Sequence, residues 1–396
     1  MLDRRGISVL AFGHLAVDTC QGAVPALLPF LIADRGLSYS QASALILAAT
    51  VSSSIVQPAF GLLADRRAIP WAMPVALAIA GAGIAAVGLV DSYALIFALI
   101  VVSGVGVAAF HPEGSRYTHY VSGAQPGRAM SFFSVGGNAG FALGPILVTP
   151  LVLVFGLEGT LALVVLPGLA AVLITGEIAR LERFRAAPAS HHGADEAVNH
   201  WGAFARLGGA VSLRSVVFFG LTTFIPLYFI DELGTSTAAA NGALIAMLVG
   251  GMAGTLIGGR IADHTSPRTV FAASLAFVAP LVVVFLLAGP LLATIVAMLL
   301  GAATIATFSV TVVLGQALLP GHLGLASGFT LGLSIGVGGI AAAALGALAD
   351  ATSLRTVIEV TAFAALGAVA LALSLPGGRR REPAAERVVA PAEARV

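Results

Sequence analysis

Lysine is absent from the 396-residue sequence, and cysteine occurs once, as Cys20. A phosphate-binding Walker loop and a Schiff base with retinal or pyridoxal phosphate both need a lysine, and a disulfide needs a second cysteine. The sequence therefore argues against direct ATP-driven pumping by this chain alone and excludes a disulfide within it. We predict no cofactor.

Charged residues are also scarce, at 10% of the chain against about 25% in a typical soluble domain. Hydrophobic residues make up 58% of the chain, and the mean hydropathy is +0.99. Apolar runs of about 20 residues, each long enough to cross about 30 Å of hydrocarbon, recur from end to end. This composition predicts an all-α protein of the lipid bilayer. We expect a monomer and no nucleic-acid partner.

Glycine, proline and charged clusters divide the apolar runs into twelve expected transmembrane helices. These cover residues 7–32, 41–63, 70–90, 93–117, 127–155, 158–179, 210–231, 238–262, 268–289, 291–318, 322–349 and 354–375. The first run is expected to stay uncleaved, because Asp18 and Gln21 interrupt it and no small-residue cleavage site of a signal peptide follows.

One polar segment separates six spans from six. The expected organisation is an N-terminal six-helix bundle, a cytoplasmic linker, a C-terminal six-helix bundle and a disordered cytoplasmic tail, at 1–179, 180–209, 210–376 and 377–396. With the N-terminus inside, all arginines except Arg35 and Arg355 fall in cytoplasmic segments. The positive-inside rule thus predicts an inner-membrane protein with both termini in the cytoplasm.

Two short patterns recur in the two halves. "PFLIADRGLS" at 29–38 resembles "PLYFIDELGTS" at 226–236, and "GLLADRR" at 61–67 resembles "GRIADHT" at 259–265. The offsets are 197 and 198 residues, about half the chain. Two parallel halves with a substrate site between them near mid-membrane imply a rocking type of alternating access.

These motifs resemble those of the major facilitator superfamily. The loop after the second span matches the superfamily's loop motif through Gly61, Leu63, Ala64, Asp65 and Arg66, and a degenerate copy contains Asp263 and Arg268. The fifth span matches a glycine-rich pattern that the superfamily associates with antiporters, through Gly136, Gly140, Gly144 and Pro145. The resemblance implies twelve transmembrane helices in two pseudo-symmetric six-helix bundles. The chain departs from the family at the intramembrane arginine of helix four, where Ile100 stands.

A narrower resemblance rests on four strings in order: "DTCQGAVPALLPFL", "SSSIVQPAFGLLADRR", "AAFHPEGSR" and "MSFFSVGGNAGFALGP". Together they are similar to the fosmidomycin resistance proteins, a branch of proton-driven drug exporters. The leading hypothesis is therefore a proton-coupled exporter, an antiporter of small molecules or drugs. The alternative is a proton-linked importer of a small metabolite on the same fold. We predict neither an enzyme nor a receptor, since no HExxH motif, GxSxG motif or histidine cluster is evident within a span.

Asp18 lies about 18 Å of helix beyond Gly6, near the centre of the first span. A carboxylate at that depth costs about 2.5–3.5 kcal/mol on insertion scales. His14 stands four residues before it and Gln21 three after, so the three share one helical face. We predict that Asp18 carries the coupled proton with help from His14, and that Gln21 contacts substrate. The alternative is a structural aspartate with a permanent partner.

The fourth span ends in "FHPEGSR", where Glu113 and Arg116 are spaced to pair on one face. Glu113 is either a second protonation point or half of a structural pair that fixes the helix end. His111 is a candidate substrate contact. Asp65 is expected to latch the two halves together by capping a helix near residue 321 or by pairing with Arg116 or Arg128, unless it is a solvated loop charge.

The remaining candidates are weaker. The glycines of the fifth span recur every four residues, which permits close helix packing with or without a role in coupling, and Pro145 bends the helix. Asn138 lies about 15 Å beyond Arg128, at mid-membrane depth, and needs a partner there. Thr307 and Thr311 are candidate substrate contacts that could instead bond their own helix. The linker histidines lack acidic or cysteine ligands at suitable spacing, so we predict no metal site.

The sequence places no arginine at mid-membrane depth. A phosphonate such as fosmidomycin would favour one, because a guanidinium binds such anions in a bidentate manner. The substrate therefore stays open between an anion held by helix termini and amides and a less charged molecule.

Overall fold

The computed structural model describes residues 2–57, 59–60, 69–123, 126–184, 199–319, 326 and 329–376. Within these ranges the chain is helical and contains no strand. The N-terminal half consists of α1 (Arg4–Arg35), α2 (Tyr39–Ser54), α4 (Ala72–Ala86), η1 (Val87–Leu89), α5 (Tyr93–Tyr120), α6 (Pro126–Phe155), η2 (Leu157–Val164), α7 (Val165–Leu181) and η3 (Glu182–Phe184).

The C-terminal half follows the same order of spans. It consists of α8 (Trp201–Asp231), α9 (Thr237–His264), α10 (Pro267–Ala276), α11 (Val278–Leu287), α12 (Pro290–Ile305), α13 (Phe308–Leu318), the π-helical turn η4 (Phe329–Leu333), α15 (Ser334–Ala351) and α16 (Leu354–Leu373). Two spans are interrupted, because α10 and α11 meet at Phe277 and α12 and α13 are separated by a turn at 306–307.

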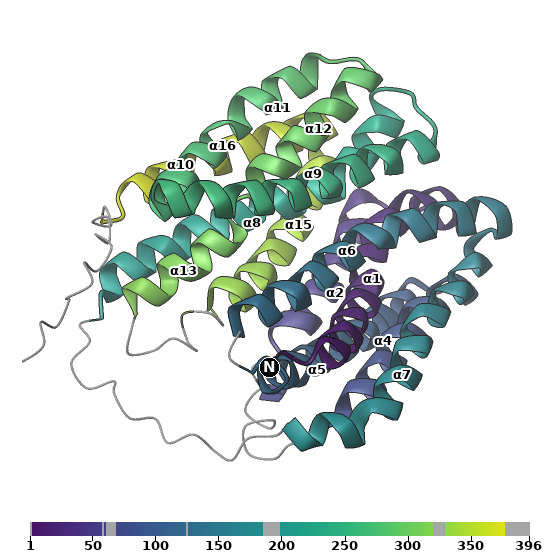
Figure 1. Cartoon of the computed structure of the whole chain (residues 1–396). Coiled ribbons are helices and arrows are strands. Elements are labelled where there is room, and N and C mark those ends of the chain that lie inside the picture. Colours follow the sequence, from purple (N-terminus) through teal and green to yellow (C-terminus); the bar gives the residue numbers. More distant parts are fainter. Residues whose placement is uncertain are drawn as a thin grey trace, which may run out of the picture.

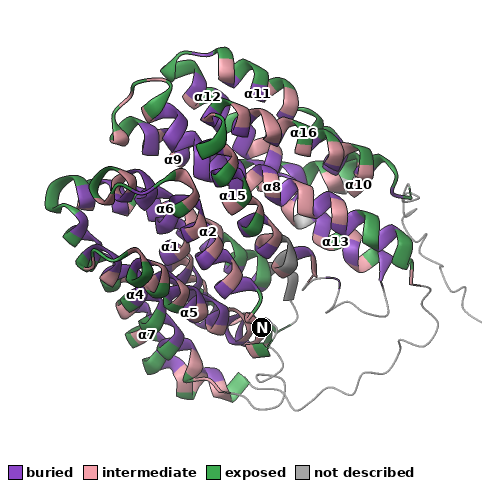
Figure 2. Ribbon diagram, turned by 180° about the vertical axis from the view of Figure 1, so that it is seen from behind, coloured by how far each residue is buried: buried purple, intermediate pink, exposed green. Residues whose placement is uncertain are grey.

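The fold is that of twelve transmembrane helices in two bundles, as predicted. In the described part of the chain, ten helices are long and apolar enough to cross a membrane, and the segment Ile335–Ala351 is a shorter apolar helix. Two hydrophobic cores are present, one in the C-terminal half and one centred on the N-terminal half that also includes Phe219, Leu244, Leu248 and Ala342. Figure 1 shows the two halves as separate groups of helices. Figure 2 shows buried residues on their inner faces and many exposed ones on the outer helices, where apolar side chains face lipid.

The repeated sequence at 29–38 and 226–236 has a structural basis. After α1, Gly36 adopts the left-handed conformation, with a φ of 64°, and its N–H bonds to Ile32. After α8, Gly234 has a φ of 63°. A positive φ at the end of a helix favours glycine. The repeat therefore encodes the same helix ending in both halves.

The start of α8 differs from the predicted span. The helix begins at Trp201, inside the expected linker, and runs without interruption to Asp231. Arg214 consequently lies well within a membrane-spanning helix and not in a cytoplasmic segment. Counting charges along the sequence could not detect this, because the helix continues through the polar residues before it.

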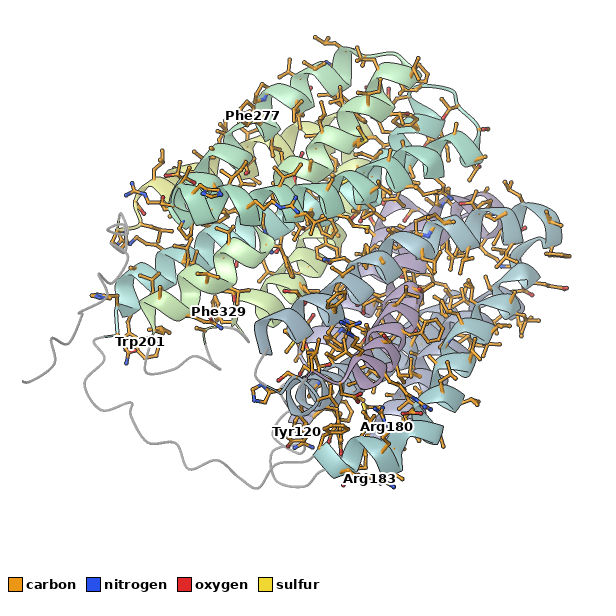
Figure 3. All side chains as sticks on the ribbon, viewed as in Figure 1. Tyr120, Arg180, Arg183, Trp201, Phe277 and Phe329 are labelled. Atoms are coloured by element: carbon orange, nitrogen blue, oxygen red, sulfur yellow. The ribbon has the colours of Figure 1, made fainter. Side chains whose placement is uncertain are left out.

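Ion pairs gather at the end of the N-terminal half where the chain begins. Arg180 binds Asp3 at 2.5 Å, and Glu177 accepts from both Arg5 and Arg180. Figure 3 shows Arg180, Arg183 and Tyr120 at this end of the N-terminal half, and Trp201 and Phe329 at one end of the C-terminal half.

At the opposite end, the two halves are joined by polar contacts. Asp350, at the end of α15, accepts hydrogen bonds from the N–H groups of Tyr39 and Ser40, each at 2.9 Å, and from the Ser40 hydroxyl. The Tyr39 hydroxyl donates to Asp231 of α8 at 2.5 Å. We call these four residues the clasp. A carboxylate at the N-terminus of α2 is favourably placed with respect to the helix dipole.

Candidate functional site: a buried histidine–aspartate cluster

His14, Asp18 and His111 form one polar cluster between membrane-spanning helices. The Asp18 Oδ2 atom lies 3.2 Å from His14 Nε2, and its Oδ1 lies 3.3 Å from His111 Nε2. The two Nε2 atoms are 3.1 Å apart. The side chains of Asp18 and His111 are 16% and 21% exposed, so water can reach the edge of the cluster.

The outer nitrogen of each imidazole faces a backbone carbonyl. His14 Nδ1 lies 2.7 Å from the oxygen of Phe133, and His111 Nδ1 lies 2.7 Å from that of Val107. A carbonyl only accepts, so both Nδ1 atoms carry hydrogen. In a neutral ring, Nε2 then has a lone pair and no hydrogen. The backbone thus fixes the tautomer of both histidines and turns their acceptor atoms towards Asp18.

Close packing of α1 against α6 positions the cluster. Gly136, Gly140 and Gly144 each touch α1 so closely that an added Cβ would come within 2.3 Å of the backbone. The Phe133 ring stacks on His14 with 4.1 Å between ring centroids. Small residues at four-residue spacing permit this approach, as the sequence suggested. Their contacts serve packing, and a separate role in coupling stays a prediction.

Gly137 borders the cluster, although no pattern in the sequence marks it as a functional residue. A Cβ at this position would lie 2.4 Å from His14 Nε2 and 2.7 Å from Asp18 Oδ2. Gly137 therefore leaves the space in which the polar atoms meet.

Glu113 has partners of its own outside the cluster. Its carboxylate binds Arg116, with 2.6 Å between Oε1 and Nη2, and also accepts from the Ile69 N–H at 3.0 Å. These contacts tie the end of α5 to the chain that leads into α4. They favour the structural alternative for Glu113 over a second protonation point.

Among the described residues, no hydrogen bond or ion pair joins the other candidates to the cluster. Gln21 donates to the Ser53 hydroxyl at 3.1 Å. Thr307 and Thr311 donate to carbonyls of their own span, at 3.0 and 2.8 Å, as the backbone-bonding alternative expected. Asn138 is half-buried, and no hydrogen bond to another described residue is found for it. Arg268 donates to the Leu373 carbonyl.

Several predictions of the sequence cannot be compared with this structure. Gly61, Asp65 and Arg66 lie outside the described residues, and so do the side chains of Arg128 and Asp263. Pro145, which is predicted to bend the fifth span, is described and lies inside α6. The latch at Asp65 therefore stays a proposal.

The cluster also has the composition of a metal site. One ligand atom from each of the three residues lies within 4.8 Å of the others, and imidazole and carboxylate are ligands of zinc. The sequence gave no sign of such a grouping, because His14 and His111 are 97 residues apart. A proton and a metal ion would occupy the same lone pairs.

A polar cluster between spanning helices, in a fold of two related halves, is typical of membrane transporters. The chain belongs to the Major Facilitator Superfamily, whose family model matches residues 10–343. Its relatives and its fold are those of membrane transporters, not of enzymes.

Two curated relatives match nearly the whole chain. An uncharacterized MFS-type transporter, YfnC of Bacillus subtilis (strain 168), is 32% identical over 376 residues, covering 92% of this chain and 91% of the relative. The fosmidomycin resistance protein of Escherichia coli (strain K12) is 30% identical over 385 residues, covering 95% and 94%.

Solved structures share the fold. A bacterial homolog of the human lysosomal transporter Spinster, in an inward-facing and occupied conformation, has a TM-score of 0.73 at 15% identity, covering 93% of this chain and 95% of that one. The nucleoside transporter NupG has a TM-score of 0.72 at 13% identity, covering 94% and 99%. At these identities the likeness establishes the fold alone.

Proposed function

We propose that this transporter is a proton-coupled exporter of small molecules in the inner membrane, with both termini in the cytoplasm. Asp18, His14 and His111 together bind the transported proton. The support for this is the meeting of three acceptor groups, two Nε2 atoms and one carboxylate, within 3.3 Å of one another.

These close contacts between acceptor atoms need a proton to be favourable. With both Nδ1 hydrogens committed to carbonyls, two neutral rings and an ionised Asp18 would direct only lone pairs at each other. One added proton on an Nε2 atom turns the repulsion into hydrogen bonds with the other ring or with the carboxylate. The protonated cluster is then neutral overall, as an imidazolium paired with a carboxylate.

Loss of this proton gives a mechanism for coupling. The deprotonated cluster carries one negative charge, which is costly to enclose in a low-dielectric interior and favours a hydrated, open cavity. The neutral cluster can be enclosed. Proton binding therefore biases the equilibrium between open and closed arrangements of the two halves, as alternating access requires.

The name of the E. coli relative favours export of fosmidomycin or a similar compound, since 30% identity extends over 95% of this chain. The experiment uses the purified full-length protein in liposomes with an imposed pH gradient and labelled fosmidomycin. We expect fosmidomycin to move in the direction opposite to the protons and to stop when a protonophore collapses the gradient.

Movement in the same direction as the protons would support the importer alternative, and transport indifferent to the gradient would contradict proton coupling. A parallel reaction with EDTA separates protons from metal ions. Transport that continues in the chelator supports the proton, whereas transport that stops and is restored by Zn²⁺ would assign the cluster to a metal.

A further inference from the structure

Arg214 is a buried cation without a counter-charge in the described part of the chain. The residue is 3% exposed, and its Nε and Nη1 atoms have no hydrogen-bond partner among the described residues. No described acidic side chain forms an ion pair with it. The Phe308 ring of α13 lies over the guanidinium, 5.2 Å from ring centroid to Cζ. A cation–π contact of this kind compensates only part of the lost hydration.

The residue lies within the membrane. It stands 13 residues after Trp201 and 17 before Asp231 on the uninterrupted helix α8. Its neighbour Leu213 packs against Gly367, which is six residues, or about 9 Å of helix, before the end of α16. Ionised groups at such depth are rare, and they mark substrate or ion pathways.

The position of Phe218 shows which way this face of α8 is turned. Phe218 is four residues beyond Arg214, so the two side chains share one helical face. The Phe218 ring packs against Phe141 of α6, with 6.1 Å between centroids. Arg214 is therefore on the face of α8 directed at the other half, where a site between the halves would lie.

The repeat gives Arg214 a counterpart in the first half. Subtracting the offset of 197 residues that relates Pro226 to Pro29 aligns Arg214 with Val17, directly before Asp18. The acid of the N-terminal half and the base of the C-terminal half thus occupy corresponding depths in α1 and α8.

We propose that Arg214 binds the anionic group of the transported molecule, a phosphonate, phosphate or carboxylate. This inference rests on the proposed transport function and names its substrate class. A guanidinium offers donors in a planar fork that matches these anions, and removal from water strengthens the contact. The Phe308 ring covers the guanidinium here, so the ring must move aside when the anion enters.

The test measures equilibrium binding to the purified full-length protein without any pH gradient. Fosmidomycin, which carries a phosphonate, is one probe, and methylphosphonate at millimolar concentration is the second, carrying the anionic group alone. Arg214→Gln and Arg214→Met remove the charge, and Arg214→Lys keeps it. Arg206→Gln is the matched control, because Arg206 is an exposed arginine on the same helix.

We expect Arg214→Gln and Arg214→Met to weaken fosmidomycin binding by roughly 10- to 100-fold, as for loss of a charged hydrogen bond, and Arg214→Lys to weaken it less. Arg206→Gln should leave binding within about twofold of wild type. Arg214→Met should at the same time raise the thermal midpoint, since an uncompensated buried charge is replaced by an apolar chain. A variant that is more stable but binds the ligand more weakly identifies a residue whose role is ligand binding and not stability.

Two results would overturn the inference. One is fosmidomycin binding that is unchanged in both neutral variants. The other is a lower thermal midpoint in Arg214→Met accompanied by weaker binding, which would make Arg214 a structural residue. If the pH gradient drives fosmidomycin transport but fosmidomycin binds equally well to the neutral Arg214 variants, the anion assignment fails and the proposed function stands. If the gradient has no effect but the probes bind through Arg214, proton coupling fails and the anion site stands.

Discussion

The Nε2 atoms of His14 and His111, on α1 and α5, lie 3.1 Å apart with the Asp18 carboxylate beside both. In the proposed mechanism a shared proton makes this contact favourable, because the Nδ1 hydrogen of each ring is already donated to a backbone carbonyl. The pair is therefore the proposed binding site for one proton, and it is built from two helices of the same half.

His111→Gln tests the need for the second imidazole. A glutamine amide donates to Asp18 at any pH, so the contact no longer depends on a proton. We expect pH-driven transport to fall by about 10-fold or more, while exchange of substrate across the membrane without a gradient persists. Flux measurements in liposomes check both, and the exposed His200→Gln is the control. Undiminished pH-driven transport would remove His111 from the proton site.

Gly137→Ala tests the space around the cluster. The new methyl group would stand 2.4 Å from His14 Nε2 and 2.7 Å from Asp18 Oδ2, so the polar atoms must separate. Overpacking of this kind costs about 1–3 kcal/mol. We expect a lower thermal midpoint and a large loss of pH-driven transport. Gly168→Ala is the control, because nothing lies within 4 Å of its added Cβ. Equal behaviour of the two variants would contradict the geometry of the cluster.

Glu113→Gln separates the two alternatives for Glu113. Its partner Arg116 would lose a counter-charge in a pair whose acid is 4% exposed, and breaking a buried pair costs about 3–5 kcal/mol. Because Arg116 is partly exposed, the loss of stability should be near the lower end of this range. We expect a lower thermal midpoint of unfolding. At temperatures where the variant is folded, the pH dependence of its transport should be unaltered. A changed pH dependence with normal stability would make Glu113 a proton carrier.

The clasp predicts a conformational effect of Asp350→Asn. Burial opposes ionisation of Asp350, but the hydrogen bonds from Ser40 and Tyr39 outweigh it and lower the pKa of the carboxyl. The ionised form thus stabilises the joined state above the ordinary pKa of the carboxyl, and this contribution is lost as pH falls through the lowered value. At neutral pH, Asp350→Asn should have the same effect as protonation of Asp350 at low pH, and the two halves should separate at this end.

Spin labels on cysteines at Leu37 and Thr352 can measure this separation, in a background where Cys20 is replaced by serine. We expect a larger population of long distances in Asp350→Asn than in the parent. Asp91→Asn is a control that removes a carboxylate which pairs with Arg35 outside the clasp. Identical distance distributions in the two variants would show that the clasp does not hold the halves together.

Much of the fold could be predicted from the sequence, because each span is an apolar run bounded by residues that end helices. The repeated Asp and Gly after the first and seventh spans reflect real helix ends at Gly36 and Gly234. The early start of α8 could not be predicted, since "WGAFARLGG" reads as a polar linker. As a consequence, the sequence does not reveal Arg214 as an intramembrane charge.

The site was predictable only in part. Asp18 and His14 share a helical face, and four-residue spacing is visible in a sequence. The sequence predicts His111 as a substrate contact, but its approach to Asp18 depends on how α5 packs against α1, which no local pattern encodes. Gly137 is one glycine among many in α6, and only the positions of His14 and Asp18 reveal what its missing side chain permits.

The most direct test of the central claim is transport by Asp18→Asn in liposomes, measured once under an imposed pH gradient and once as substrate exchange without a gradient. Asparagine keeps the size of the side chain and most of its hydrogen bonds but cannot bind and release a proton at physiological pH. The proposed mechanism predicts that exchange of fosmidomycin persists while pH-driven transport is lost. If Asp18→Asn carried out pH-driven transport at the wild-type rate, that result would contradict the mechanism.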